Sequence, residues 1–166
     1  MAKAKGGRGR AEQAAVPRAA ALYGAAGLIP FVVCALAVWV APIPWNAFAL
    51  DIQLYYGATI LSFLGAAHWG LALAGYGARG DSAAACTPAR LGWSVAPALV
   101  AWLSLIMVPL VGVTTQIVAF AAVFFGDLRA VKLGLAPAWY PRLRRPLTAV
   151  VLIALGVSLL RVLWQA

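Results

Sequence analysis

Hydrophobic residues of this chain occur in five long runs separated by polar segments. The runs cover residues 19–40, 52–76, 91–108, 110–126 and 147–164. A helix of about 20 apolar residues crosses the hydrocarbon core of a bilayer. The pattern therefore predicts an all-α, polytopic integral membrane protein, with a bundle of five transmembrane helices in a domain over residues 19–166.

Smaller features refine this pattern. Only the segment MVPLVG separates the third run from the fourth, which predicts a tight helical hairpin. Pro30 and Pro97 lie inside runs, and we expect helix kinks at both because proline removes a helical hydrogen bond. Residues 1–18 are rich in Gly, Ala, Lys and Arg, which predicts a disordered, basic cytoplasmic tail.

The composition supports a membrane environment. Hydrophobic residues make up 64% of the chain and charged residues 10%, whereas about a quarter of a soluble domain is charged. The net charge of +9 is typical of nucleic-acid-binding proteins. Here, however, the basic residues lie between the apolar runs, so we expect the lipid bilayer as the partner and no nucleic acid.

The basic residues also predict the orientation. All except Arg161 lie in the tail, the second loop or the fourth loop. The positive-inside rule makes that side cytoplasmic, so the amino terminus is expected inside and the carboxyl terminus outside. The first run could instead be a cleaved signal peptide, because ALA at 35–37 resembles a cleavage site. Its apolar stretch is longer than a usual signal core and contains Pro30, which favours a membrane span.

The fourth loop, residues 128–146, is a basic segment expected to lie along the inner leaflet. Its anchoring residues are Trp139, Tyr140, Arg142, Arg144 and Arg145. Each arginine near an anionic surface contributes about 1 kcal/mol of attraction. The segment is either a topology determinant or a contact site for anionic lipids or a partner protein.

The only histidine, His68, lies inside the second run. Burial in hydrocarbon favours the neutral imidazole, which still needs a hydrogen-bond partner. Pro30 frees the carbonyl of Ala26, which lies at a similar depth in the first run. We therefore predict that His68 donates a hydrogen bond to Ala26. A proton-relay or ligand-binding role for His68 is the alternative.

Other polar residues in the runs complete a candidate polar cluster, either functional or structural. Its members are His68, Trp69, Ser62, Gln116 and Asp127. On a helical wheel, Ser62 and Trp69 share a stripe with Asp51, Tyr55 and Thr59, whereas His68 lies on another face with Gln53, Gly57, Leu64 and Gly75. This separation argues against one continuous proton path along the second run.

Gln116 shares a face of the fourth run with Ala119, Val123 and Asp127. Asp127 is expected at the carboxyl end of this helix, where a carboxylate opposes the helix dipole. The neighbouring Arg129 and Lys132 are its predicted counter-charges.

Residues for catalysis are sparse. One histidine and two well-separated cysteines cannot form a closed metal site. No phosphate-binding loop or nucleophile elbow occurs, and we expect no metal, no cofactor and no catalytic residues. An enzyme that uses His68 and Asp127 as acid and base is a minor alternative.

Four stretches carry a further signal: AGLIPF, YGATILSFLGAAHWGLAL, LGWSVAPALVAWL and GDLRAVKLGLAPAWYPRLRRPLTAVV. Together they resemble an uncharacterised bacterial membrane family, domain of unknown function 3429, which is related to mitochondrial transmembrane protein 69. The resemblance covers nearly everything after Ala19 and implies a small inner-membrane protein without a known activity. It points to these residues: Ser62, Phe63, Leu64, Gly65, His68, Trp69, Gly70, Ser94, Pro97, Asp127, Pro137, Trp139, Tyr140, Leu143 and Arg144.

Two functional hypotheses follow. The first is a non-enzymatic assembly, scaffold or quality-control component of a larger inner-membrane complex. The second is a small, oligomeric, proton-coupled transporter or carrier, with His68, Gln116, Thr59 and Ser62 along its path and helix breaks at Pro30 and Pro97. The expected location is the bacterial plasma membrane, and the mitochondrial inner membrane is the alternative.

Overall fold

The computed structural model describes residues 15–78 and 87–165. Within these residues all regular structure is helical, which confirms the all-α class. The elements are α2 (Arg18–Ala26), α3 (Ile29–Val40), α4 (Trp45–Ala78), α5 (Pro88–Leu105), α6 (Pro109–Lys132) and α7 (Tyr140–Gln165). Most of the predicted basic tail lies outside the described residues.

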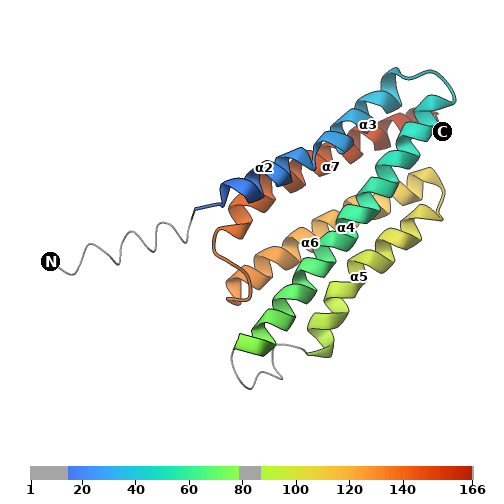
Figure 1. Ribbon diagram of the computed structural model, residues 1–166. Helices are drawn as coiled ribbons and strands as arrows, with labels where there is room; N and C mark the ends of the chain where they lie inside the picture. Colours follow the sequence, from blue (N-terminus) through green and yellow to red (C-terminus); the bar gives the residue numbers. More distant parts are fainter. Residues whose placement is uncertain (1–14, 79–86, 166) are drawn as a thin grey trace.

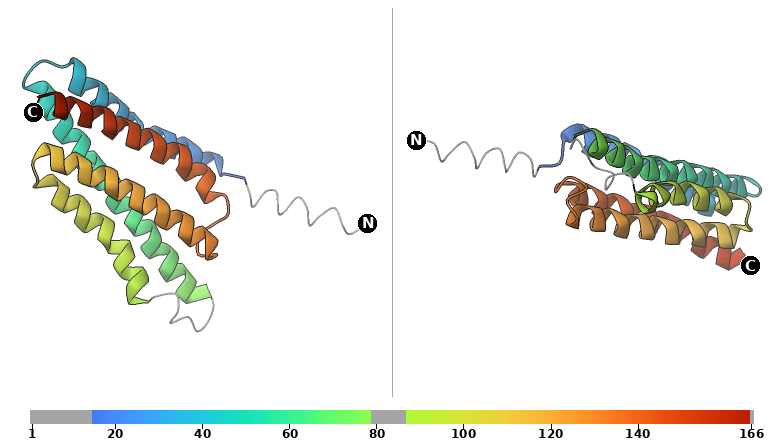
Figure 2. Two further views of the ribbon diagram at one scale, coloured as in Figure 1. Left: turned by 180° about the vertical axis from the view of Figure 1, so that it is seen from behind. Right: turned by 90° about the horizontal axis from the view of Figure 1, so that it is seen from below.

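The helices form a closed ring around one core (Figures 1 and 2). Each helix from α3 to α7 packs against the next, and α7 returns to pack against α3. Helix α4 also contacts α6 across the ring, and α2 packs only against α7 among the pairs with substantial contact. The ring brings the first and last helices side by side, so residues far apart in the sequence meet in its interior.

The first apolar run is interrupted. A turn at Gly27 and Leu28 separates α2 from α3, and Pro30 lies in the first turn of α3. Proline fits a first turn without strain, because the N–H that it lacks has no helical acceptor there. The expected kink within one continuous helix is therefore wrong at Pro30, which begins a new helix.

The hairpin between α5 and α6 is confirmed, since only residues 106–108 connect the two helices. A Cβ atom on Gly112 would lie 2.6 Å from the carbonyl oxygen of Ser104, so glycine permits this close approach. Helix α5 begins earlier than predicted, with Thr87 accepting a hydrogen bond from the Arg90 amide at its amino end. Pro97 lies inside α5, as its position in the run indicated.

The helices on either side of the fourth loop extend into the segment expected to lie along the inner leaflet. Helix α6 continues to Lys132 and α7 begins at Tyr140, so only residues 133–139 connect them. The predicted interfacial segment over 128–146 therefore includes the end of α6 and the start of α7. Sequence patterns locate helix ends less well than helices themselves, because helix ends depend on capping and tertiary contacts.

Four helical segments of the described chain are long and apolar enough to cross a membrane: Arg18–Val40, Trp45–Ala74, Pro109–Lys132 and Tyr140–Gln165. The core holds Phe31, Leu61, Phe120 and Leu155, each at most 1% exposed. Large apolar side chains also cover the outside, including Phe63, Trp102, Phe125, Ile153 and Leu160. Such a surface requires a lipid environment, and the protein is a multi-pass helical membrane protein.

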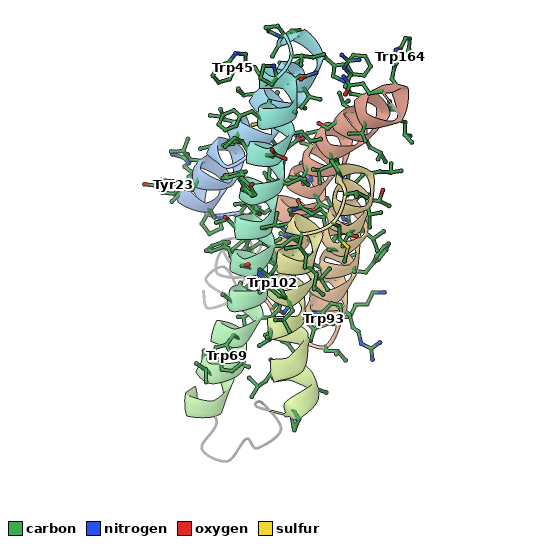
Figure 3. All side chains as sticks on the ribbon, turned by 90° about the vertical axis from the view of Figure 1, so that its right-hand side faces the viewer. Tyr23, Trp45, Trp69, Trp93, Trp102 and Trp164 are labelled. Carbon is green, nitrogen blue, oxygen red and sulfur yellow. The ribbon has the colours of Figure 1, made fainter. Side chains whose placement is uncertain are left out.

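Aromatic side chains lie at several heights along the bundle (Figure 3). Trp45 and Trp164 lie at the end where α3 joins α4, whereas Trp69 and Trp93 lie in the opposite half. Tryptophan prefers the interface between hydrocarbon and head groups. These four residues are consistent with a bilayer whose two surfaces lie near the two ends of the bundle.

Candidate functional site

A charged cluster of His68, Asp127 and Arg144 lies where α4, α6 and α7 meet, with Asp127 and Arg144 buried and His68 partly exposed. The Asp127 carboxylate accepts a hydrogen bond from Arg144 Nε through Oδ2, at 2.6 Å. Its other oxygen, Oδ1, lies 2.7 Å from Nε2 of His68. Asp127 is 1% exposed and Arg144 is 7% exposed. One carboxylate thus holds both a guanidinium and an imidazole.

The three residues meet because each follows the buried face of its helix. On α4, His68 is one turn from Leu64 and Ala72, which are both buried. On α6, Asp127 continues the buried face of Gln116, Ala119 and Val123, which confirms the face predicted for this helix. On α7, Arg144 precedes the buried residues Thr148, Val151 and Leu155. Residues three or four positions apart lie on one side of a helix. The buried faces of α4, α6 and α7 therefore bring His68, Asp127 and Arg144 together.

The pairing offsets the cost of burying these charges. A carboxylate or guanidinium loses several kcal/mol of hydration when it is buried. Removing one member of a buried pair lowers the stability by about 3–5 kcal/mol, because the other charge is left without a partner. Asp127 and Arg144 cancel each other's charge, and the second carboxylate oxygen accepts a hydrogen bond from Nε2 of His68. Two polar atoms nearby, Arg144 Nη2 and Thr148 Oγ1, are buried without a hydrogen-bond partner.

The predicted partner of His68 is wrong. His68 bonds to Asp127 and not to the carbonyl of Ala26. Carbonyl groups beside the break in the first run have other donors, since Tyr56 Oη donates to the carbonyl of Gly27 at 2.9 Å and Gln53 Nε2 donates to that of Phe31 at 3.1 Å. Side chains of α4 thus reach carbonyls of the first run at Gly27 and Phe31 and not at Ala26.

The predicted counter-charges of Asp127 are also wrong. Asp127 lies inside α6, which continues to Lys132. Arg129 and Lys132 are exposed, whereas the ion pair forms with Arg144 of α7. Arg144 therefore does not face the head groups with Arg142 and Arg145, which are both exposed. Local spacing suggested neighbours in sequence, but the buried face of α6 turns Asp127 away from them.

A second set of buried polar side chains forms an amide cluster, which we define as Gln53, Ser104, Gln116 and Ser158. Gln116 Nε2 donates to the carbonyl of Leu54 at 2.8 Å and to Ser104 Oγ at 3.1 Å. Ser158 Oγ donates to Gln53 Oε1 at 2.6 Å. All four residues are 0% exposed, so the amide cluster joins α4, α5, α6 and α7 in a closed interior.

Sequence reasoning missed Ser104 and Ser158 as members of this cluster. The helical wheel places Gln53 on the same face of α4 as His68, and this position indicates that Gln53 is also buried. The two serines carry no such signal, because a serine in a helix can satisfy its hydroxyl at a carbonyl of the same helix. Ser104 donates to Ala101 in this way, and Ser158 donates to Ala154.

The remaining members of the predicted polar cluster lie apart from His68. Ser62 donates to the carbonyl of Ala58, and Thr59 donates to that of Tyr55, both in their own helix. Trp69 is 40% exposed, and Asp51 is also exposed. The predicted separation of this stripe from the face of His68 is confirmed, and the stripe lies on the outside of the bundle.

A pocket of about 580 Å³ adjoins the charged cluster between α4, α5 and α6. Its described lining is mostly apolar and includes three basic side chains. These residues are His68, Leu71, Ala89, Arg90, Trp93, Ala122, Phe125, Gly126, Arg129, Ala130, Leu133 and Leu135. His68 thus lies between the buried Asp127 and an open cavity.

Close contacts between helices shape this region. A Cβ atom on Gly65 would collide with the carbonyl oxygen of Ser94 and lie 3.6 Å from Pro97. A Cβ atom on Gly126 would lie 2.5 Å from the Trp93 ring, which lines the pocket. Several residues of the resembling motifs therefore serve the packing of α5 against α4 and α6.

Comparison with known proteins supplies the family. The model of a family described as "Protein of unknown function (DUF3429)" matches residues 16–160. The chain is 34% identical over 151 residues to Transmembrane protein 69 of Xenopus tropicalis, a match that covers 87% of this chain and 54% of that protein. The chain thus spans about half the length of this relative. No solved structure gives a significant match. By the extent of both matches, the chain belongs to the DUF3429 family, which includes relatives of transmembrane protein 69.

Proposed function

We propose that the chain crosses the membrane five times, with its amino terminus inside and its carboxyl terminus outside. Helix α5 is the fifth crossing in addition to the four apolar segments. Its 18 residues span about 27 Å at 1.5 Å per residue, close to the ~30 Å hydrocarbon core. It lies beside α4 and α6 in the ring. Arg18, Arg90 and Arg129 lie near helix ends that the alternation of five crossings puts on one side.

Alkaline phosphatase fusions in a bacterial host test this topology. A fusion after Gln165 is expected to be active, because the enzyme folds only outside the cytoplasm. A fusion after Gly134, in the connection between α6 and α7, is the matched control and is expected to be inactive. Equal activity of both fusions would refute the five-span topology.

We further propose that the protein is a non-enzymatic assembly, scaffold or quality-control component of an inner-membrane complex, in the bacterial plasma membrane. The observation behind this proposal is the pairing of buried polar groups. His68 with Asp127, and Gln53 with Ser158, join helices that are distant in the sequence. Such contacts stabilise one arrangement of a bundle. The described pocket lining contains no hydroxyl, thiol or carboxylate group that would act as a nucleophile.

Crosslinking in native membranes tests this role. The full chain carries a photoreactive residue at Phe63, which is 68% exposed on α4, and crosslinked partners are compared between wild type and His68→Leu. We expect the variant to change its abundance or its crosslinking pattern without loss of any transport activity. Thr59→Val, on the outer stripe of the same helix, is the control and is expected to behave like wild type. A single monomeric species without a crosslinked partner would contradict the proposal.

A small, proton-coupled carrier is the second candidate, because the pocket reaches His68. The residues proposed for its path support it less well. Gln116 is closed off at 0% exposure, and Ser62 bonds only within its own helix among the described contacts. Proton uptake by protein-containing vesicles, abolished by both His68→Leu and Gln116→Leu, would establish this function in place of the first.

A further inference from the structure

The pocket beside the charged cluster has an unusual balance of charge. Arg90 and Arg129 contribute two guanidinium groups, and His68 contributes an imidazole. No aspartate or glutamate is among the described lining residues. The ion pairs of the described chain involve only Asp127 with His68 and Arg144, so neither pocket arginine has a carboxylate partner there. An anion entering the pocket would meet two cations that nothing described neutralises.

The rest of the lining is apolar. Leu71 of α4, Trp93 of α5 and Phe125 of α6 form walls on three sides. A volume of about 580 Å³ is within the usual range of ligand pockets, about 300–1,000 Å³. Such a lining offers nothing to a small inorganic anion, but it suits an acyl chain. The pocket therefore combines an anion site with a hydrocarbon site.

The orientation of His68 adds a polar contact of a different kind. The Asp127 carboxylate accepts from Nε2, which fixes the imidazole ring and leaves Nδ1 as a hydrogen-bond acceptor that suits a hydroxyl group of a ligand rather than its phosphate. Nδ1 has no hydrogen bond to any described residue. A carboxylate that holds one nitrogen of a histidine determines its tautomer and its direction. The charged cluster thereby fixes the orientation of the His68 side chain in the wall of the pocket.

We propose that this pocket binds an anionic phospholipid, with the phosphate between Arg90 and Arg129 and the upper part of one acyl chain along Trp93 and Phe125. The lipid comes from the surrounding bilayer, because the pocket lies at the basic end of the helices and its apolar walls match a lipid tail. Anionic lipids gather next to such basic surfaces. This inference does not depend on the role proposed above for the whole protein.

Lipid selection in nanodiscs tests the proposal. The full chain is reconstituted in phosphatidylglycerol and phosphatidylcholine at equal amounts, and the lipids that remain bound after gentle detergent extraction are quantified by mass spectrometry. We expect phosphatidylglycerol to be enriched on the wild type. Arg90→Gln and Arg129→Gln are each expected to lower this enrichment about five-fold. Arg18→Gln removes an exposed arginine at the same end of the bundle but outside the pocket lining, and is expected to retain the enrichment.

A pocket-filling variant and a competitor separate the remaining outcomes. Ala122→Phe fills the apolar wall without a change of charge and is expected to lower the enrichment as well. Inorganic phosphate at millimolar concentration is expected to leave the bound lipid in place. Displacement of the lipid by phosphate alone would overturn the lipid assignment in favour of a free anion. Equal loss of enrichment in Arg18→Gln, or no loss in Arg90→Gln and Arg129→Gln, would overturn the site. Melting curves of each variant in detergent confirm that the fold is intact.

Discussion

The charged cluster and the amide cluster are both buried in the same ring of helices, yet they differ in chemistry and in surroundings. On α4, His68 and Gln53 are separated by about 22 Å at 1.5 Å per residue. The amide cluster is neutral and completely enclosed. The charged cluster contains an ion pair, and its histidine borders a pocket. In the amide cluster, neutral hydrogen bonds connect four helices. Connecting helices therefore does not by itself require the buried ion pair of the charged cluster, whose burial costs more hydration.

Removing one charge is expected to have the largest effect. Asp127→Leu leaves Arg144 buried without its partner and is expected to lower the stability by about 3–5 kcal/mol. The double variant Asp127→Leu/Arg144→Leu is expected to be more stable than Asp127→Leu alone, because no unpaired charge remains. Unfolding in detergent measures both, and Asp51→Asn, an exposed acid on α4, is the control. A double variant as unstable as the sum of the single variants would show that the ion pair does not act as a unit.

Overfilling the amide cluster is expected to have an intermediate effect. A Cβ atom on Gly57 would collide with Oε1 of Gln116, whose Nε2 is held by two acceptors. Gly57→Ala is therefore expected to cost about 1–3 kcal/mol. Gly70→Ala on the same helix meets no atom within 4 Å and is expected to be neutral or slightly stabilising. Equal melting temperatures for the two variants would contradict the close packing of the amide cluster.

Truncating the amide is expected to cost less than removing the charge. Gln116→Leu keeps a similar volume and loses the hydrogen bonds to Leu54 and Ser104, each of which contributes about 0.5–1.5 kcal/mol. Ser104 still donates to Ala101, so no buried donor is left without a partner. Thr114→Val, which alters a bond within α6 only, is the control. A loss of stability as large as that of Asp127→Leu would contradict the expected difference between the charged cluster and the amide cluster.

Replacing the histidine is expected to lower stability by a similar amount to replacing Gln116. His68→Leu removes one hydrogen bond to a carboxylate that retains Arg144, which predicts a loss of about 1.5–3 kcal/mol at most, since the acceptor is charged. His68→Gln keeps a donor and is expected to recover part of this loss. Both are measured by unfolding in detergent. Lipid selection by His68→Leu, measured as above, shows whether the residue also serves the pocket; full stability with lost selection would place its role there.

The sequence was sufficient to predict the helices, the hairpin and the polar face of α6 that ends in Asp127. These features follow from local periodicity and from short connections. The contact of His68 with Asp127 and Arg144 was not predictable in this way, because it depends on how α4, α6 and α7 are rotated about their axes. The resemblance to the family did point to all three residues, but it gave no reason to connect them.

The errors have the same origin. Pro30 was expected to bend a helix, and Arg129 and Lys132 were expected to balance Asp127, because both expectations considered only neighbours along the chain. In the folded ring, Tyr56 and Gln53 serve the carbonyls near Pro30, and Arg144 serves Asp127. Buried polar groups take partners from whichever helix the core brings closest.

The closure of the ring by α7 against α3 has a consequence for biosynthesis. The ribosome makes α4 well before α7, so Gln53 enters the membrane before Ser158 has been added to the chain. Until then the nascent chain carries a Gln53 without its partner Ser158. Packing of α7 against α3 then closes the ring and brings this partner to α4.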